Sequence, residues 1–170
     1  IPDKTSAKAV INVRGIKNSQ NTGSRYIDCE FTLVGGEFNG RKVWSIVMDP
    51  SFEGNSEEAR KLGKKFLVRM LEASGLVTIG NEESYGRFPT IQDVINGLNG
   101  QTVAIKVGIK KGNDGHADKN SVSDYYSPNP DSGYADKFKQ VMSGSAGPSA
   151  QPSLGGKPGF LTTPKNGNPF

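Results

Sequence analysis

Residues 25–48, RYIDCEFTLVGGEFNGRKVWSIVM, decide the class of fold. In the first half of this stretch the apolar side chains stand at every second position, at Ile27, Cys29, Phe31 and Leu33. A period of two is typical of a β-strand with one buried face. The loop Gly35–Gly40 is rich in residues that adopt turn conformations, and a second strand is expected at Arg41–Met48. The stretch therefore predicts a β-hairpin.

The same alternation recurs before and after the hairpin. Ala9, Ile11 and Val13 alternate with polar positions, and residues 102–109 repeat the pattern over a longer run. A weaker strand is expected at Ser121–Tyr126. Together these segments predict five strands.

Between the predicted strands at 41–48 and 102–109 the apolar period changes to three or four residues, which is typical of a helix. Asn55 or Ser56 is the expected N-cap of this helix, and Gly75 follows its end. Its apolar face carries Ala59, Leu62, Phe66, Met70 and Ala73. A second, short helix is predicted at Thr90–Leu98, with Thr90 as its cap.

The order of elements predicts the architecture. Three strands, a helix and two further strands match the OB-type five-stranded Greek-key barrel, in which the helix lies between strands 3 and 4. From Ser143 onward the chain is rich in Gly, Pro, Ser and Asn, and such a segment buries too little apolar area to fold. We therefore expect a mainly β domain at residues 1–142 and a disordered C-terminal tail at residues 143–170.

Composition narrows the function classes. The net charge of +4 suits a polyanionic partner without identifying one. Cys29 is the only cysteine, which excludes an intramolecular disulfide and a zinc site built on cysteine pairs, and a reducing cytoplasm is the expected location. No apolar run approaches the ~20 residues that cross a bilayer, so no membrane association is expected.

An enzyme is not expected. His116 is the sole histidine and lies in a Gly-containing polar loop, where an imidazole is not held against a nucleophile. Asp114, His116 and Asp118 are spaced as alternate residues of that loop, and a solvated hairpin loop explains them better than a metal site. We therefore expect no cofactor and no metal.

Basic and aromatic residues gather where an OB barrel forms its ligand groove, on the strand 2–3 face and in the loops that join strands 1 to 2 and 4 to 5. A protein that holds single strands needs cations for the phosphates and aromatic faces for the bases. The predicted nucleic-acid-binding residues are Arg14, Lys17, Arg25, Tyr26, Arg41, Lys42, Trp44, Lys106, Lys110, Lys111 and Tyr125.

Three points stay open at this level. Both faces of the strand around Trp44 are partly apolar, so alternation does not decide between a core and a stacking role for Trp44. Asp28 and Glu30 on the outward face of the neighbouring strand argue against a uniformly basic groove. The basic helix face at residues 60–69 is either a solvated surface or an alternative path for nucleic acid.

The run at residues 25–31, followed by Gly35–Trp44, resembles phage-encoded single-stranded DNA-binding proteins of replication and recombination modules. The basic helix, residues 98–101 and residues 120–122 continue the similarity, which covers roughly residues 8–126. The resemblance implies an OB fold, protection of single-stranded DNA without a cofactor, and a location in the cytoplasm of the infected bacterial cell.

The tail ends in Pro169 and Phe170, which are similar to the tip through which bacterial single-strand-binding proteins recruit partner enzymes. Those tips are acidic and this one is not, so recruitment by charge is not expected. We expect Pro169 and Phe170 to dock on a replication or recombination protein, or on a neighbouring subunit of a homo-oligomer. The rival interpretation of the whole chain is an OB-like protein-interaction or structural module that does not bind nucleic acid.

Overall fold

The computed structural model describes residues 1–113 and 115–144, with five strands and several helices in the described part. The strands are β1 (Thr5–Asn18), β2 (Arg25–Val34), β3 (Lys42–Met48), β4 (Thr102–Lys110) and β5 (Lys119–Tyr126). The helices are α1 (Glu57–Ala73), α2 (Glu82–Gly86), α3 (Ile91–Leu98), the 3-10 turn η1 (Pro130–Ser132) and α4 (Ala135–Met142). The predicted strands and the two predicted helices are confirmed, with α1 capped by Ser56 and α3 by Thr90.

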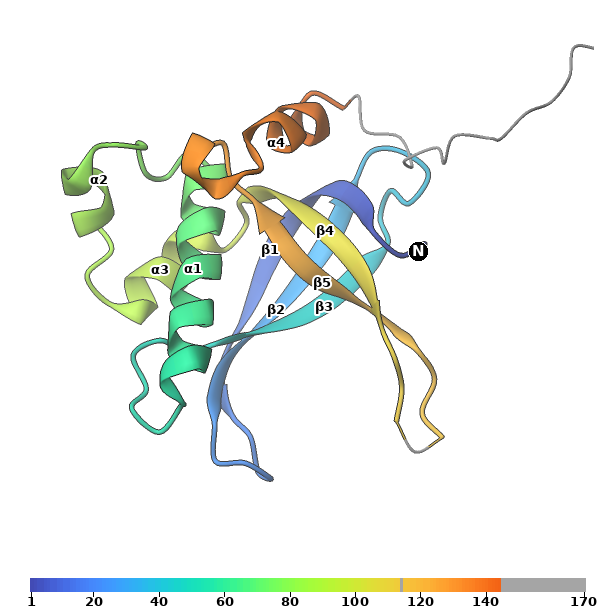
Figure 1. Cartoon of the computed structure of the whole chain (residues 1–170), viewed down its shortest axis with the longest axis horizontal. Helices are drawn as coiled ribbons and strands as arrows, with labels where there is room; N and C mark the ends of the chain where they lie inside the picture. The colour runs from blue at the N-terminus through green and yellow to red at the C-terminus, as the bar shows by residue number, and fades with distance from the viewer. Residues whose placement is uncertain (114, 145–170) are drawn as a thin grey trace, which may run out of the picture.

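All five strands form one antiparallel sheet in the order β3-β2-β1-β4-β5 (Figure 1). The sheet curves until its two edges meet, where the Ser45 hydroxyl lies 3.5 Å from the Val122 carbonyl oxygen. Among the described residues, however, no ladder of hydrogen bonds joins β3 to β5. The mainly β fold is therefore confirmed, but the predicted OB-type barrel is found only as a curved sheet that stays open along this seam.

Strand β1 is longer than the sequence pattern indicates, and a bulge separates its two parts. The register with β2 shifts between Val13 and Gly15, and Gly15 has a φ of 115°, which is strained for residues with a Cβ. The bulge lets β1 pair with β4 through its first half and with β2 along most of its length. The N-terminal part of β1 therefore joins β2 to β4 at the centre of the sheet, while its C-terminal part forms a projecting hairpin with β2.

The hydrophobic core lies between the concave face of the sheet and α1. The largest side chains fully buried in it include Phe31, Ile11, Ile27, Leu33, Met70 and Tyr125. The ring of Tyr125 lies 5.8 Å from that of Phe31 and 5.0 Å from that of Phe66. Because Tyr125 is 1% exposed, its predicted place in a ligand groove is wrong: it points inward beneath α1.

Helix α1 approaches the end of β3 through a glycine. A Cβ built on Gly63 would lie 1.9 Å from the main-chain oxygen of Met48, closer than any real contact. The helix therefore sits on the end of the strand at a distance that only glycine allows at this position. The sequence pattern gave no sign of this contact.

Arg25 anchors the connection from β3 to α1. Its Nε donates to the buried Asp49 carboxylate at 2.7 Å, and its guanidinium carbon lies 4.7 Å from the centre of the Phe52 ring. The Asn55 side chain bonds main-chain groups of both Arg25 and Asp49. These contacts tie the start of β2 to the loop before α1, so Arg25 has a structural role.

Helix α4 covers the outer face of β4 and β5, which the sequence pattern had not predicted to be buried (Figure 1). Val141 packs there with Ala104 and Tyr126, and the Tyr134 ring lies 5.0 Å from that of Tyr126. Tyr125 and Tyr126 point to opposite faces of β5. Both are buried because α1 covers one face of β5 and α4 the other.

Candidate nucleic-acid interface

The outer face of the β2–β3 pair carries aromatic, charged and apolar side chains in register. Across the two strands Tyr26 pairs with Met48, Asp28 with Ile46, Glu30 with Trp44 and Thr32 with Lys42. On the opposite face of β3, Val43 and Val47 are buried in the core. This alternation settles the question about Trp44, which points outward with 48% of its surface exposed, next to Ile46 at 54%.

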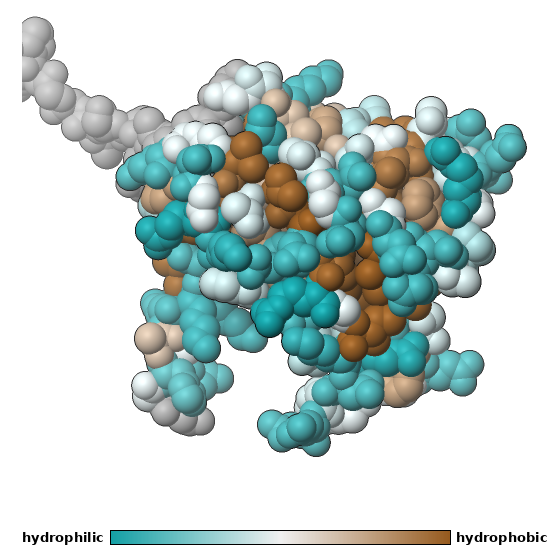
Figure 2. Space-filling view, turned by 180° about the vertical axis from the view of Figure 1, so that it is seen from behind, coloured by the Kyte–Doolittle hydropathy of each residue, from teal (hydrophilic) through white to brown (hydrophobic). Residues whose placement is uncertain are grey.

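A groove of about 500 Å³ runs along this face toward the β4–β5 hairpin. The β1–β2 and β4–β5 hairpins project from the same side of the sheet, and the space-filling view shows a hollow between two projecting arms (Figures 1 and 2). Strand β2 contributes Asp28 to the groove. The other lining residues are Arg41, Lys42, Trp44, Ser45, Ile46, Lys110, Lys119, Asn120 and Ser121.

Three of the cations that line the groove are available to pair with an anionic ligand. In the part of the chain that the structure describes, Arg41, Lys110 and Lys119 form no ion pair. Arg41 lies just before β3, whereas Lys110 and Lys119 face each other across the β4–β5 ladder. Residues more than 60 positions apart in the chain are thus brought to one groove by the curvature of the sheet.

Other cations of this face are held by carboxylates of β2. Lys17 and Arg14 lie 2.5 and 3.8 Å from Asp28, and Lys42 lies 2.9 Å from Glu30. The indole N–H of Trp44 donates to Glu30 at 3.2 Å. The hydrogen bond from Lys42 is the main cause that holds the pKa of Glu30 below its usual value, so Glu30 stays ionised at neutral pH.

The remaining predicted residues lie outside the groove. Arg25 belongs to the Asp49 anchor described above, and Tyr26 is half-buried beside Met48 on the outer face. Lys106 lies on the side of β4 that also carries Ala104, near α4. Lys111 pairs with Asp118 at 2.6 Å within the hairpin loop, and this bond raises the pKa of Lys111 and lowers that of Asp118.

Part of the groove was not predicted from the sequence. Ile46, Lys119, Asn120 and Ser121 line it but were not predicted as site residues. For Ile46 the signal was available, because it shares a strand face with Trp44. For the three residues at the start of β5 the signal lies in the hairpin, which places Lys119 opposite Lys110 and the next two residues opposite Ile109 and Gly108. The predicted docking residues Pro169 and Phe170 lie outside the described residues.

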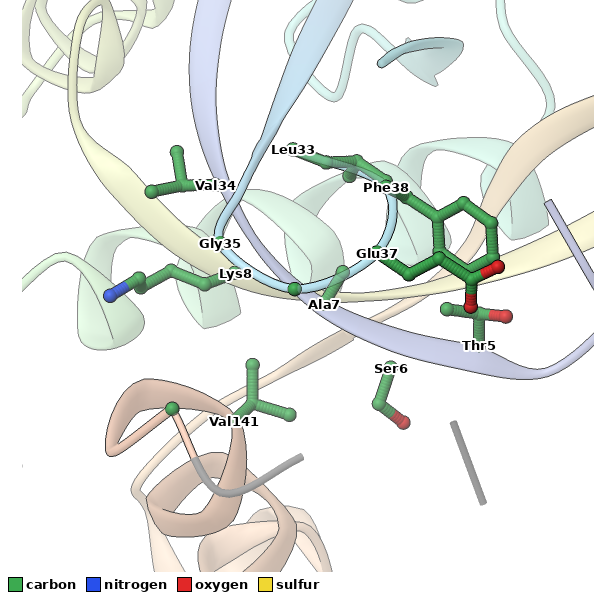
Figure 3. A pocket seen from close by; sticks show the side chains of 12 residues that line it. Thr5, Ser6, Ala7, Lys8, Leu33, Val34, Gly35, Glu37, Phe38 and Val141 are labelled. Carbon is green, nitrogen blue, oxygen red and sulfur yellow. The ribbon is translucent and has the colours of Figure 1, made fainter. Parts of the chain in front are cut away.

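Two further hollows in the described part of the chain lack this combination of cations and an exposed aromatic ring. A pocket of about 160 Å³ lies where α4 meets β1 and the β2–β3 loop, and its walls include Ala7, Leu33, Val34, Phe38 and Val141 (Figure 3). A second hollow of about 350 Å³ between α1 and α3 is lined mainly by apolar side chains. The thiol of Cys29 is buried in the core, and this burial raises its pKa to about 12, which makes it unreactive.

No helix among the described residues is both long and apolar enough to span a bilayer. In the same residues no three His, Cys, Asp or Glu side chains gather as metal ligands would. No protein-family model matches the chain, and no curated protein matches it.

Proposed function

We propose that this protein binds single-stranded DNA, largely without regard to sequence, and protects it during phage DNA replication or recombination in the cytoplasm of the infected cell. The observation that carries the proposal is the groove, which places the exposed Trp44 ring beside Arg41, Lys110 and Lys119. An exposed aromatic face stacks with unpaired bases, and cations beside it neutralise the phosphates of the same strand. The binding needs no cofactor.

The preference for single strands follows from the aromatic ring. In a duplex each base is stacked between its neighbours, so Trp44 can reach a base face only where the strand is unpaired. A protein whose contacts were only phosphate contacts would bind duplex DNA as well. The pairing of a ring with free cations therefore favours single-stranded nucleic acid.

The topology supports an OB-type assignment. A partly open five-stranded Greek-key barrel binds oligonucleotides on its strand 2–3 face and between the loops joining strands 1 to 2 and 4 to 5. The present groove occupies the corresponding face, and the approach of Ser45 to Val122 lies where such a barrel would close between strands 3 and 5. We propose that the curved sheet is an OB barrel with an open seam.

Measuring affinity for a labelled oligo(dT), a duplex of the same length and the equivalent RNA tests this proposal. We expect tight binding of the single-stranded DNA and weak binding of the duplex. Equal affinity for duplex and single strand would contradict a role for base stacking, and binding of none of the three would refute the proposal.

One observation favours the rival function, a protein-interaction module. The hollow between α1 and α3 is lined by Leu67, Leu71, Phe88, Ile91 and Val94, a composition suited to an apolar peptide. This function predicts no binding to nucleic acid and no effect of groove substitutions. The same three binding measurements therefore separate the two functions.

A further inference from the structure

We propose that Asp28 and Glu30 compete with the phosphates of a bound strand for the cations beside the groove. The two carboxylates thereby limit the affinity for single-stranded DNA. This inference rests on the proposed function, since it concerns competition between these carboxylates and the phosphates of the strand. It assigns a regulatory role to residues that oppose binding by their charge.

The geometry of the two carboxylates carries the inference. Their side chains are only 13% exposed, whereas those of Arg14, Lys17 and Lys42 are 43–50% exposed. The cations therefore lie over the carboxylates and present their outer surfaces to the solvent. A phosphate that binds over the β2–β3 face meets cations whose inner side is already occupied by a negative charge.

The charge balance follows from these contacts. Glu30 offsets the charge of Lys42, and Asp28 offsets one of the two charges of Arg14 and Lys17. Among the residues that the structure describes, the groove-lining cations Arg41, Lys110 and Lys119 form no ion pair. A DNA strand bound along the β2–β3 face thus gains less binding free energy from Arg14, Lys17 and Lys42 than from three cations without internal partners.

A purely stabilising role does not account for the arrangement. Ion pairs whose cations are largely exposed contribute little to folding free energy, because solvent screens them and ordering long side chains costs entropy. Two neighbouring acidic side chains on one binding face nevertheless lower the net charge of that face by two units. Their main physical effect is on an anionic ligand.

The experiment uses substitutions that remove charge and keep shape. In Glu30→Gln the amide oxygen still accepts the Trp44 indole N–H, so the ring keeps its orientation, and Asp28→Asn is the independent second variant. Glu57→Gln is the control, because Glu57 pairs with the cation Lys61 on the exposed face of α1. Each variant changes the net charge by the same amount.

Affinities are measured for oligo(dT) and oligo(dC) at several salt concentrations, with thermal melting of each variant as a check on folding. We expect Glu30→Gln and Asp28→Asn each to raise affinity roughly threefold at low salt, as a unit charge about 7 Å from a phosphate predicts. The gain should be equal for the two oligonucleotides and should shrink as salt rises. Glu57→Gln should leave affinity unchanged.

Unchanged or weaker binding by both folded groove variants would overturn the inference. A loss confined to oligo(dC) would also overturn it, since it would mean that the carboxylates accept from the amino group of cytosine. An equal gain in Glu57→Gln would reduce the effect to net charge and overturn it too. Failure of the wild-type protein to bind either oligonucleotide would refute the proposed function itself, whereas wild-type binding with unchanged variants refutes only this inference.

Discussion

The indole N–H of Trp44 donates to the carboxylate of Glu30 at 3.2 Å, across the pair of strands that forms the floor of the groove. The same carboxylate accepts from Lys42. A single acidic residue therefore fixes the orientation of the exposed ring and holds the cation beside it. This arrangement keeps an aromatic face in place before any ligand arrives.

Replacing Trp44 with Ala should weaken binding to a short oligo(dT) by ~1–3 kcal/mol, the usual contribution of one stacked base. The melting temperature should change little, because about half of the side chain is exposed and its removal leaves no cavity in the core. Trp44→Phe is the matched control and should retain most of the affinity. A large fall in melting temperature with unchanged affinity would mean that Trp44 supports the fold.

The three groove cations that form no ion pair with any described residue should dominate the phosphate contacts. Changing Arg41, Lys110 and Lys119 to Ala should reduce the log-log salt slope of oligo(dT) binding by about 2, at about 0.7 per contact. The control changes Lys61, Lys64 and Lys65 on α1 to Ala, which removes the same charge from another face. Equal losses in the two triple variants would place binding on the helix, or show that only net charge matters.

Gly63→Ala should destabilise the domain by ~1–3 kcal/mol, because the added methyl group would overlap the main-chain oxygen of Met48 and push α1 away from β3. Gly86→Ala is the control, since a Cβ at that position meets nothing within 4 Å. Denaturant unfolding of the two variants measures the difference. Wild-type stability in Gly63→Ala would contradict the close contact.

The Asp49 anchor should make stability depend on acid pH. Burial by itself raises the pKa of Asp49, but the hydrogen bonds from Ser51 and Arg25 outweigh it and the pKa is lowered. A carboxyl whose folded-state pKa is lowered stabilises the fold above its unfolded-state pKa, and this contribution disappears as the pH falls through the folded-state value. Melting temperatures of wild type and Asp49→Asn should therefore differ at neutral pH and converge in acid. A constant difference would contradict the lowered pKa.

Removal of α4 should destabilise the domain, whereas removal of the residues after Gly144 should not. A chain ending at Gly133 uncovers Tyr126 and Ala104, and each large apolar side chain returned to water costs ~1.5–3 kcal/mol. A chain ending at Gly144 keeps Val141 in place. Thermal melting of the two truncated proteins compares them, and a large loss on the second truncation would mean that the last residues pack on the domain.

The strands and helices whose apolar residues recur at a regular spacing could be predicted from sequence. The pairing of the strands could be predicted only in part. The hairpin of β2 and β3 follows from strict alternation and a turn-rich loop, and α1 from its apolar stripe and its Ser56 cap. Helix α4 could not be predicted, because its apolar side chains pack on the outer face of β4 and β5. The sequence does not show that this face is apolar and buried. Tyr125 was misplaced for a different reason, because it lies on the opposite face of β5, which packs against α1.

The candidate site was predictable where it depends on one strand and unpredictable where it depends on two. Lys42 and Lys110 were predicted and line the groove, and Trp44 was predicted without a settled orientation. The ion pair of Arg25 with Asp49 could not be predicted, because Asp49 follows the end of another strand. The internal pairing of Lys17 with Asp28 likewise depends on the register between β1 and β2, which composition does not reveal.

Trp44 is the only tryptophan of the chain, so its fluorescence reports on the groove alone. Titration with oligo(dT) at rising salt concentrations is therefore the most direct test of single-strand binding in this groove. Single-strand binding in this groove predicts saturable quenching of Trp44 and an affinity that falls steeply with salt, with a log-log slope of about −0.7 for each neutralised phosphate. Unchanged Trp44 fluorescence at saturating oligo(dT), or an affinity independent of salt, would contradict it.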